Sequence, residues 1–361
     1  MSVEVLVNPG CGASFERPSL PEVIAFHRRL PGYSPTRLVS VPVLAERLGV
    51  SEVLVKAETA RFGLPSFKIL GASWAIYRAT CDRLGREPAP WTDVDELAAH
   101  FAGLRPFALA TATDGNHGRA VAHMARLLGF EARIFVPAGT VAARIAAIRA
   151  EGAQVTVVDG DYDAAVHRAA DEASDRCLVI SDTSWQGYET TPARVIEGYS
   201  TIFVEIDDAL AGRDQPTTVV VPVGVGALMA AAVRHYAGSG VHLVGVEPED
   251  ADCVLESVRA GHLVTVPGPH RSVMVGLNCG TPSFIIWPEL STGVDAYVSV
   301  DDTWAYEAVR ALAEGGVIAG ETGAAATAAM LAVAEDRTLR AAVGLIAEAR
   351  VLLLCTEGPT G

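Results

Sequence analysis

Short apolar runs alternate with longer Ala-rich segments from about residue 105 onward, and this alternation is the strongest constraint on the fold. The runs read FALATAT, EARIFVP, QVTVVDG, CLVISDT, TTVVVPV, VHLVGVEPE and RVLLLCTEG. Strands that are mostly apolar and are separated by segments of helical length are typical of βαβ units. The pattern therefore predicts an α/β fold with open, parallel-type sheets covered by helices on both faces.

The chain is long for a single domain, because it has 361 residues and half of them are apolar. Two segments rich in proline and charge, GREPAPWTDVDE (85–96) and GYETTP (187–192), interrupt the pattern. We expect the chain to cross between domains there. This predicts a large domain of residues 1–80 and 190–361, with a smaller α/β domain of residues 81–189 inserted into it.

The charge and the cysteines exclude several classes of function. The net charge of −15 and the absence of a basic stripe argue against nucleic-acid binding. No apolar run is long enough to span a membrane, and no signal segment is evident, so we expect a cytoplasmic protein. The six cysteines are far apart and lack a C-x-x-C spacing, which favours neither a metal site nor a disulfide scaffold.

Only two of the 28 basic residues are lysines, Lys56 and Lys68. Lys68 opens a predicted helix, where it shares a face with the small residues Gly71, Ala72 and Ala75. Such a face admits another backbone or a planar ligand. A lysine in that gap would be a desolvated nucleophile that arginine cannot replace in forming an imine; the alternative is a solvated surface lysine. Lys56, at a predicted strand end, competes for this role, although an ion pair with Glu58 or with a neighbour would also explain it.

The loop TATDGNHGRA lies between a predicted strand and a predicted helix, and places Asp114, Asn116 and His117 at the carboxyl end of the strand. Open parallel sheets bind ligands at that edge. Asn116 offers both a donor and an acceptor to a ligand. The alternative is that Asp114 or Asn116 only caps the helix.

The loop VPVGVGAL also follows a strand and opens a helix, so that the amides from Gly224 to Leu228 could bind a phosphate. A dinucleotide site is the rival interpretation, with Glu247 as the ribose-binding acid. However, Met229 occupies the third glycine position of that motif. The residues favour a monophosphate over NAD and leave a purely structural turn open.

Two other strand ends carry polar side chains. CTEG supplies Thr356 and Glu357, GETGAAA opens the preceding helix with Glu321, and SDTSWQGY supplies Asp182. Helix capping is the alternative for the first two motifs, and a turn aspartate is the alternative for Asp182.

Taken in order, these motifs resemble the pyridoxal-phosphate enzymes of the tryptophan-synthase β-subunit fold (fold type II), and within them the diaminopropionate ammonia-lyase family. The likeness runs nearly end to end through YSPTRL, RFGLPSFKILGASWAI, TATDGNHGRAVA, DYDAAV, DTSWQGY, VPVGVGAL, VEPEDADC, MVGLNCG, GETGA and CTEG. It implies two sheet domains with the active site between them, and a homodimer.

The resemblance also implies roles for particular residues. Lys68 would hold pyridoxal phosphate as a Schiff base, Asn116 would bond the ring oxygen, and Thr356 would meet the pyridine nitrogen. Gly224, Val225, Gly226, Ala227 and Leu228 would bind the phosphate. A hydroxyl does not keep the ring nitrogen protonated, which favours elimination over transamination.

In that family 2,3-diaminopropionate, as the D or the L isomer, is converted to pyruvate and ammonia through an aminoacrylate. Two isomers require bases on two faces, which the resemblance assigns to Lys68 and Asp114, while Asp182 assists recognition of the substrate amine. Cys253 and Cys279 match paired cysteines of the family, and in a reducing cytoplasm we expect thiols.

Two departures bear on the substrate. Arg37 replaces the second proline of the usual PTPL motif, and the chain is shorter than typical members. A serine or threonine dehydratase, or a β-replacement synthase, is therefore the nearest alternative. An NAD-dependent oxidoreductase and a non-catalytic relative are the more distant ones.

Overall fold

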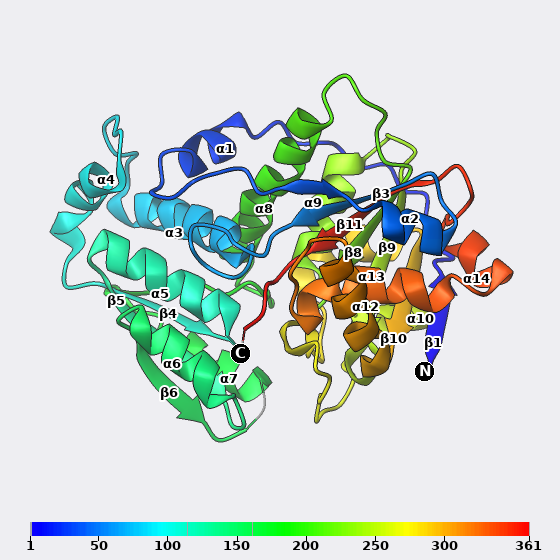
Figure 1. The fold of residues 1–361 in the computed structure, drawn as a ribbon. Coiled ribbons are helices and arrows are strands. Elements are labelled where there is room, and N and C mark those ends of the chain that lie inside the picture. Colours follow the sequence, from blue (N-terminus) through cyan, green and yellow to red (C-terminus); the bar gives the residue numbers. More distant parts are fainter. Residues whose placement is uncertain (1, 114, 161, 361) are drawn as a thin grey trace. The chain divides into compact units, whose positions relative to one another are not determined.

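A computed structural model describes residues 2–113, 115–160 and 162–360, so Asp114 lies outside the described residues. Backbone contacts divide the chain into two compact units. Unit 1 comprises Met1–Ser19, Pro35–Ala60 and Ile202–Pro359, and unit 2 comprises Leu20–Ser34, Arg61–Thr201 and Thr360–Gly361. The elements can be followed in Figure 1.

The strands and helices alternate along most of the chain. The strands are β1 (Val3–Val7), β2 (Leu38–Ser40), β3 (Glu52–Ala57), β4 (Ala108–Ala112), β5 (Glu131–Pro137), β6 (Gln154–Val158), β7 (Cys177–Val179), β8 (Thr218–Pro222), β9 (His242–Pro248), β10 (Ala296–Val300) and β11 (Arg350–Cys355). The α-helices are α1 (Pro21–His27), α2 (Pro42–Leu48), α3 (Lys68–Leu84), α4 (Val94–His100), α5 (Asn116–Leu128), α6 (Ala142–Ala150), α7 (Tyr162–Ala170), α8 (Thr190–Ala209), α9 (Ala227–Tyr236), α10 (Cys253–Ala260), α11 (Trp287–Thr292), α12 (Asp302–Glu314), α13 (Glu321–Val333) and α14 (Arg337–Ala342). Short 3-10 helices cover Ala102–Leu104, Glu249–Ala251, Val275–Leu277 and Phe284–Ile286.

Unit 1 contains a sheet with the strand order β1-β10-β9-β8-β11-β3-β2. Its inner strands are parallel, as the apolar runs predict, but β1 pairs antiparallel with β10 and β2 pairs antiparallel with β3. These two edge strands were not predicted. Both are short and only partly buried, so they lack the apolar run that marks the inner strands.

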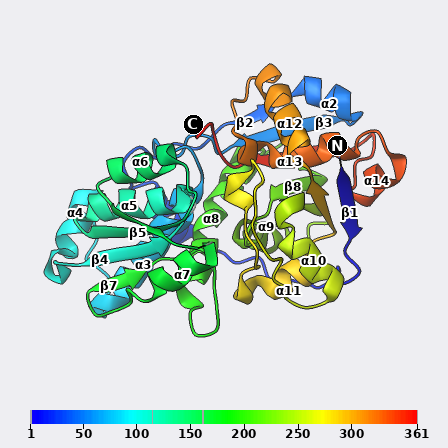
Figure 2. The same cartoon turned by 90° about the horizontal axis from the view of Figure 1, so that it is seen from below.

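Helices cover both faces of this sheet, with α12 and α13 on one side and α9, α10 and α11 on the other (Figure 2). Helix α13 has the sequence ETGAAATAAMLAV, and every residue after Glu321 is buried. A helix that is apolar all round is stable only inside a core. Its alanines and the strand valines accordingly share one hydrophobic cluster.

The parallel register brings two predicted functional segments to one edge of this sheet. Strand β8 ends at Pro222, just before the loop 224–228, and its neighbour β11 ends at Cys355, just before Thr356. Because neighbouring parallel strands point the same way, both segments lie at the carboxyl edge.

Unit 2 contains a parallel sheet with the order β6-β5-β4-β7. Helices α5 and α7 both pack on β4 and β5, and α3 packs against α5. Strand β4 leads into the loop before Asn116, and its neighbour β7 leads into Asp182. These segments therefore share the carboxyl edge of the second sheet.

The two contact units do not coincide with the domain limits expected from the sequence. Residues 61–80 and 190–201 belong to unit 2, whereas the sequence grouped them with the large domain. Which segments fold together as domains stays a prediction.

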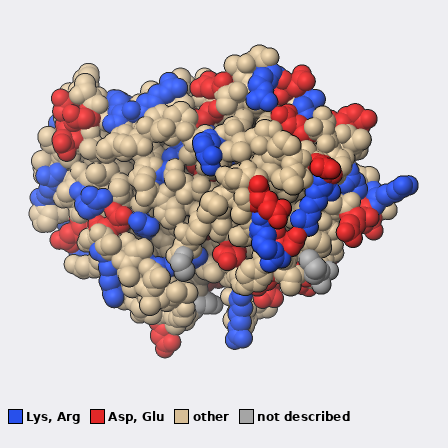
Figure 3. Space-filling view, in the orientation of Figure 1, with Lys and Arg blue, Asp and Glu red and all other residues tan. Residues whose placement is uncertain are grey.

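Surface charge and helix length add two observations. On the face shown in Figure 3, basic and acidic side chains are interspersed, and the described residues form no basic stripe there. None of the described helices combines the length and the apolar character needed to cross a bilayer.

Candidate functional site

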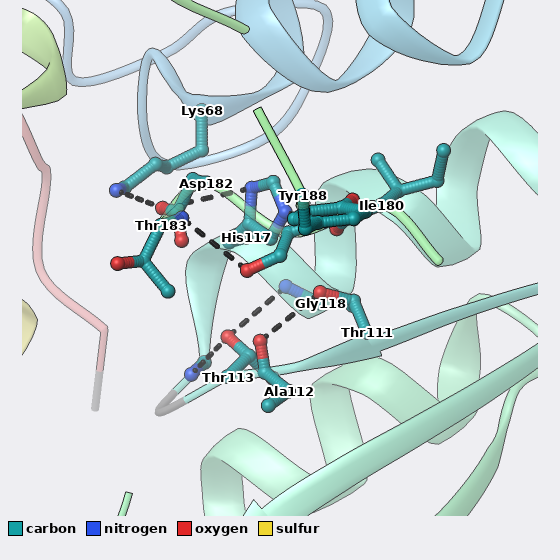
Figure 4. A network of polar contacts seen from close by, with 12 residues as sticks. Lys68, Thr111, Ala112, Thr113, His117, Gly118, Ile180, Asp182, Thr183 and Tyr188 are labelled. Carbon is teal, nitrogen blue, oxygen red and sulfur yellow. Dashed lines mark hydrogen bonds and ion pairs between the residues drawn. The ribbon is translucent and has the colours of Figure 1, made fainter. Parts of the chain in front are cut away.

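Lys68 is the first residue of α3, as predicted, and its amine lies beside an acid (Figure 4). The Nζ atom donates a hydrogen bond to Oδ2 of Asp182 over 2.6 Å. The Lys68 side chain is 22% exposed and that of Asp182 is 7% exposed. The amine is thus held in place while still open to a reactant, and Asp182 is more than a turn residue.

Asp182 is an anion at neutral pH. Burial by itself would raise the pKa of its carboxyl, but the nearby His117 and Lys68, together with the hydrogen bond from Lys68, hold that pKa well below its usual range. A carboxylate with so low a pKa binds and orients a cation, and it does not serve as a proton donor at neutral pH.

His117 joins this cluster, although no role was predicted for it. Its Nε2 atom lies 2.8 Å from the carbonyl oxygen of Ile180, and because a carbonyl only accepts, Nε2 must carry the proton. Its Nδ1 atom lies 3.8 Å from Oδ2 of Asp182. The position of His117 in the loop DGNHG was the one sequence feature that could have indicated a functional role. Its partner Ile180 comes from a distant segment and could not be predicted.

The asparagine loop is shaped by Thr113. Its Oγ1 atom accepts hydrogen bonds from the amides of Gly115, at 2.9 Å, and Gly118, at 3.0 Å. Helix α5 begins at Asn116 with Gly115 as its cap residue and no side-chain cap. The capping alternative is therefore wrong for Asn116, while Asp114 lies outside the described residues.

The face of α3 that consists of small residues lets helix α8 pack closely against Gly71. A Cβ atom there would lie 2.8 Å from the carbonyl oxygen of Val195 and 2.6 Å from the ring of Tyr199, both on α8. Of the two open alternatives, a neighbouring backbone and a planar ligand, the backbone occupies this position.

Tyr199 lies close to this cluster and was missed in the sequence. Its ring packs on Phe67 with 4.8 Å between centroids. Its hydroxyl is buried and has no hydrogen-bond partner among the described residues. Burial raises the pKa of this phenol, and the charges of Lys68 and Asp182 act on it in opposite directions. No sequence signal connects Tyr199 with Lys68, because the two are far apart in the chain.

Lys56 has a different environment from Lys68. Its Nζ atom lies 2.6 Å from Oε2 of Glu205, 3.0 Å from the carbonyl oxygen of Thr36 and 3.9 Å from Oε1 of Glu58. The Lys56 side chain is 1% exposed. The expected ion pair with Glu58 is present but long, and the close partner, Glu205, is remote in sequence. An amine so enclosed is structural.

The glycines of the loop 224–228 are packed closely by neighbouring side chains of the protein. Gly226 has φ +98°, and a Cβ atom there would lie 2.8 Å from Cδ1 of Ile286. A Cβ atom at Gly224 would lie 3.2 Å from Sγ of Cys279. Helix α9 begins at Ala227, and the first amides of a helix have no acceptor within it. Across the described residues, none of the amides of 224–228 donates a hydrogen bond.

Glu247 does not serve as a ribose ligand. Its buried carboxylate accepts hydrogen bonds from the amides of Val254 and Leu255, both at 2.8 Å, and so caps α10. Both carboxylate oxygens are used, which argues against the dinucleotide interpretation. Cys253, on the same helix, and Cys279 are free thiols, as predicted.

Thr356 follows β11 and is 3% exposed. Its Oγ1 atom has no hydrogen-bond partner among the described residues. A buried hydroxyl without a partner is unfavourable unless a ligand supplies one. Unit 1 thus offers amides and a hydroxyl at one sheet edge, and unit 2 offers an amine held by an acid. The amides and the hydroxyl of unit 1 suit an anion and a polar ring atom of a ligand, and the amine of unit 2, taken by itself, is a group that can form an imine.

Comparison with known proteins identifies the class. The model of the family described as "Pyridoxal-phosphate dependent enzyme" matches residues 29–357. The chain therefore belongs to the pyridoxal-phosphate dependent enzymes, and the predicted cofactor and fold class are confirmed.

Within that family the chain is similar to diaminopropionate ammonia-lyases. It is 33% identical to the enzyme of Salmonella typhimurium, with 94% of this chain and 89% of the relative covered. It is 34% identical to the enzyme of Escherichia coli K12, with 93% and 87% covered. The resemblance stated from the motifs is confirmed.

Comparison with solved structures also finds diaminopropionate ammonia-lyases. The Escherichia coli diaminopropionate ammonia-lyase in complex with an aminoacrylate-PLP azomethine intermediate has a TM-score of 0.89 at 31% identity, covering 99% of this chain and 94% of that chain. Its complex with D-serine has a TM-score of 0.91, with the same identity and coverage. A tomato threonine deaminase, with a TM-score of 0.76 at 23% identity over 99% of this chain and 93% of that chain, shares the fold.

Proposed function

We propose that this protein is a pyridoxal-phosphate-dependent ammonia-lyase that eliminates the β-amino group of 2,3-diaminopropionate and yields pyruvate and ammonia. The observation that carries this function is the similarity to diaminopropionate ammonia-lyases over nearly the whole chain. The Lys68–Asp182 pair supplies the reactive amine that such an enzyme needs.

The residues divide the binding of the cofactor among them. Lys68 would hold it covalently, the amides of Gly224 to Leu228 would bind its phosphate, Thr356 would face its ring nitrogen and Asn116 its ring oxygen. When bound, pyridoxal phosphate withdraws electrons from the substrate Cα and so makes the α-proton acidic. The amides of the loop, which donate no hydrogen bond among the described residues, and the unpartnered hydroxyl of Thr356 support these assignments.

Proton transfer falls to the side chains. The Lys68 amine would accept the α-proton on one face of the substrate and Asp114 would accept it on the other, which would allow both isomers to react. Asp182, as an anion beside Lys68, would hold the ammonium groups of Lys68 and of the substrate in position.

We also propose that the protein works as a cytoplasmic homodimer that binds only small amino acids. The motif-level resemblance to the family supports the dimer, and the described helices contain no membrane span. Light scattering of the purified holoenzyme tests the assembly, and a monomer mass would contradict it.

Pyruvate release tests the reaction. The holoenzyme is incubated with D- and L-diaminopropionate, and pyruvate is measured with lactate dehydrogenase and NADH. D-serine, L-serine and L-threonine serve as comparison substrates. We expect diaminopropionate to react fastest. No pyruvate from either isomer, with turnover of serine or threonine, would replace this function with a dehydratase.

The two-base arrangement has its own test. Asp114→Asn should reduce kcat for one isomer of diaminopropionate far more than for the other, by about 10²-fold or more, because only one face of the substrate loses its base. Equal losses for the two isomers would contradict the assignment.

A further inference from the structure

Unit 1 contains a cavity at the edge of its sheet opposite the loop 224–228. The cavity has a volume of about 540 Å³. It is lined by residues at the amino ends of three neighbouring strands, namely Thr217 before β8, Val241 before β9 and Arg350 at the start of β11. The predicted cofactor-binding segments follow the carboxyl ends of β8 and β11, so this cavity is a separate site.

The lining of the cavity is cationic, although the protein has a net charge of −15. Its charged side chains are Arg17, Arg350 and a single acid, Asp207, and His235 adds a further basic group. An excess of positive charge in a hollow of an acidic protein attracts small anions.

Asp207 pairs with Arg17 and offsets that one positive charge, so that Arg350 carries the excess of positive charge in the cavity. Oδ2 accepts a hydrogen bond from Nη2 of Arg17 over 2.5 Å, and Oδ1 lies 3.2 Å from Nε2 of His235. The carboxylate thereby fixes Arg17, whose side chain remains 52% exposed. Its remaining guanidinium hydrogens can reach a ligand.

Arg350 is also fixed in place with donors to spare. Its Nε atom donates to the carbonyl oxygen of Gln215 over 2.7 Å, and its backbone amide donates to Oγ1 of Thr217 over 3.0 Å. Within the described chain neither Nη atom of Arg350 has an acceptor. An anchored guanidinium with two free NH₂ groups is suited to bidentate binding of a carboxylate or phosphate.

We propose that this cavity binds a small organic anion, a metabolite with a carboxylate or phosphate group, with Arg350 as the main cation and Arg17 as the second. The volume lies within the range of metabolite pockets. His235 and Tyr236, which line the cavity, are the last residues of α9, and α9 begins in the loop 224–228. A helix of this length spans about 15 Å, so the anion site and the phosphate loop share one rigid element.

Binding to the holoenzyme tests the site. Calorimetric titration with inorganic phosphate and, separately, with pyruvate distinguishes the two kinds of anion, while the bound cofactor keeps the probes out of the loop 224–228. We expect one saturable site for at least one probe. Arg350→Met should weaken that binding at least tenfold and Arg17→Met should weaken it severalfold.

Arg213→Met is the matched control. Arg213 is an exposed arginine of the same region that pairs with Glu52 and does not line the cavity, so its loss should leave the affinity unchanged. Circular dichroism checks the fold, and the exposed Arg17 keeps the test valid if Arg350→Met does not fold. Equal affinity in wild type and Arg17→Met, or no saturable binding of either probe, would overturn the site. This readout does not depend on lyase activity.

Discussion

Lys56 and Lys68 are the only two lysines of the chain, and their surroundings differ in the property that separates a structural amine from a reactive one. Lys56 is 1% exposed, and its ammonium contacts Glu205, Thr36 and Glu58. Lys68 is 22% exposed, and its amine donates a hydrogen bond to Asp182. An ammonium enclosed by oxygens is fixed as a cation, whereas a partly exposed amine beside an anion can exchange protons and react.

The comparison explains why arginine replaces neither lysine. At Lys56 a compact ammonium fits between the carbonyl oxygen of Thr36 and the carboxylates of Glu205 and Glu58, a geometry that a planar guanidinium does not match. At Lys68 only a primary amine can form an imine. The same residue type is thus required at two positions for unrelated reasons.

The largest expected effect is that of Lys68→Arg. It keeps a positive charge for Asp182 but cannot form an imine, so kcat/KM for diaminopropionate should fall by about 10³-fold or more. The visible absorbance of the bound cofactor should also change. Initial rates of pyruvate formation and absorbance spectra check this. A Lys68→Arg variant with the rate of pyruvate formation and the cofactor absorbance of wild type would show that Lys68 is not the reactive amine.

Lys56→Met should act on stability instead. It removes the ammonium that donates to the buried carboxylate of Glu205, and breaking such a buried pair lowers the free energy of unfolding by about 3–5 kcal/mol. Urea unfolding measures this loss, and the folded fraction should keep its cofactor absorbance. The double variant Lys56→Met/Glu205→Gln should recover part of the stability. A loss below about 1 kcal/mol would contradict the structural role.

Asp182→Asn tests the anion beside Lys68. Hydrogen bonds to charged groups contribute about 1.5–3 kcal/mol, so kcat/KM should fall by about 10- to 100-fold. In the folded protein the pKa of Asp182 lies below the ordinary carboxyl value. The ionised carboxylate therefore stabilises the fold at pH values above the ordinary pKa, and this stabilisation is lost as the pH falls towards the lowered pKa.

Wild type should therefore lose stability more steeply than Asp182→Asn as the pH falls below about 4. Urea unfolding midpoints between pH 6 and pH 3 check the sign. If the unfolding midpoints of the two proteins changed with pH in the same way, the carboxylate of Asp182 would not be stabilised by its neighbours.

Tyr199→Phe should have the smallest effect. Its hydroxyl has no hydrogen-bond partner among the described residues, so its removal should change the free energy of unfolding by less than about 1 kcal/mol. The rate with diaminopropionate should stay within about threefold of wild type. A much larger fall in rate with unchanged stability would indicate that this hydroxyl contacts the substrate or the cofactor.

The sequence predicts what depends on local pattern. The strands β4 to β9 and β11, the start of α3 at Lys68 and the loops that follow β4, β7, β8 and β11 lie where the apolar runs and glycines indicate, whereas the inner strand β10 was not predicted. The short edge strands β1 and β2 carry too weak a pattern to predict. Their antiparallel pairing depends on neighbours that no local rule identifies.

Partners that are remote in sequence escape such prediction. Glu205 lies 149 residues from Lys56, and Asp182 lies 114 residues from Lys68. Glu58 was expected as the partner of Lys56 because it is adjacent, but at 3.9 Å it is the more distant of the two acids. Spacing shows which groups can react, whereas only the fold shows which acid holds each amine.

Mapping the lysine that carries the cofactor tests this assignment most directly. The holoenzyme is reduced with borohydride, which fixes the imine as a stable secondary amine, and is then digested and sequenced by mass spectrometry. Because the chain has only two lysines, the result is unambiguous. The pyridoxyl group should be found on Lys68 alone. A pyridoxyl group on Lys56, or on neither lysine, would contradict the account.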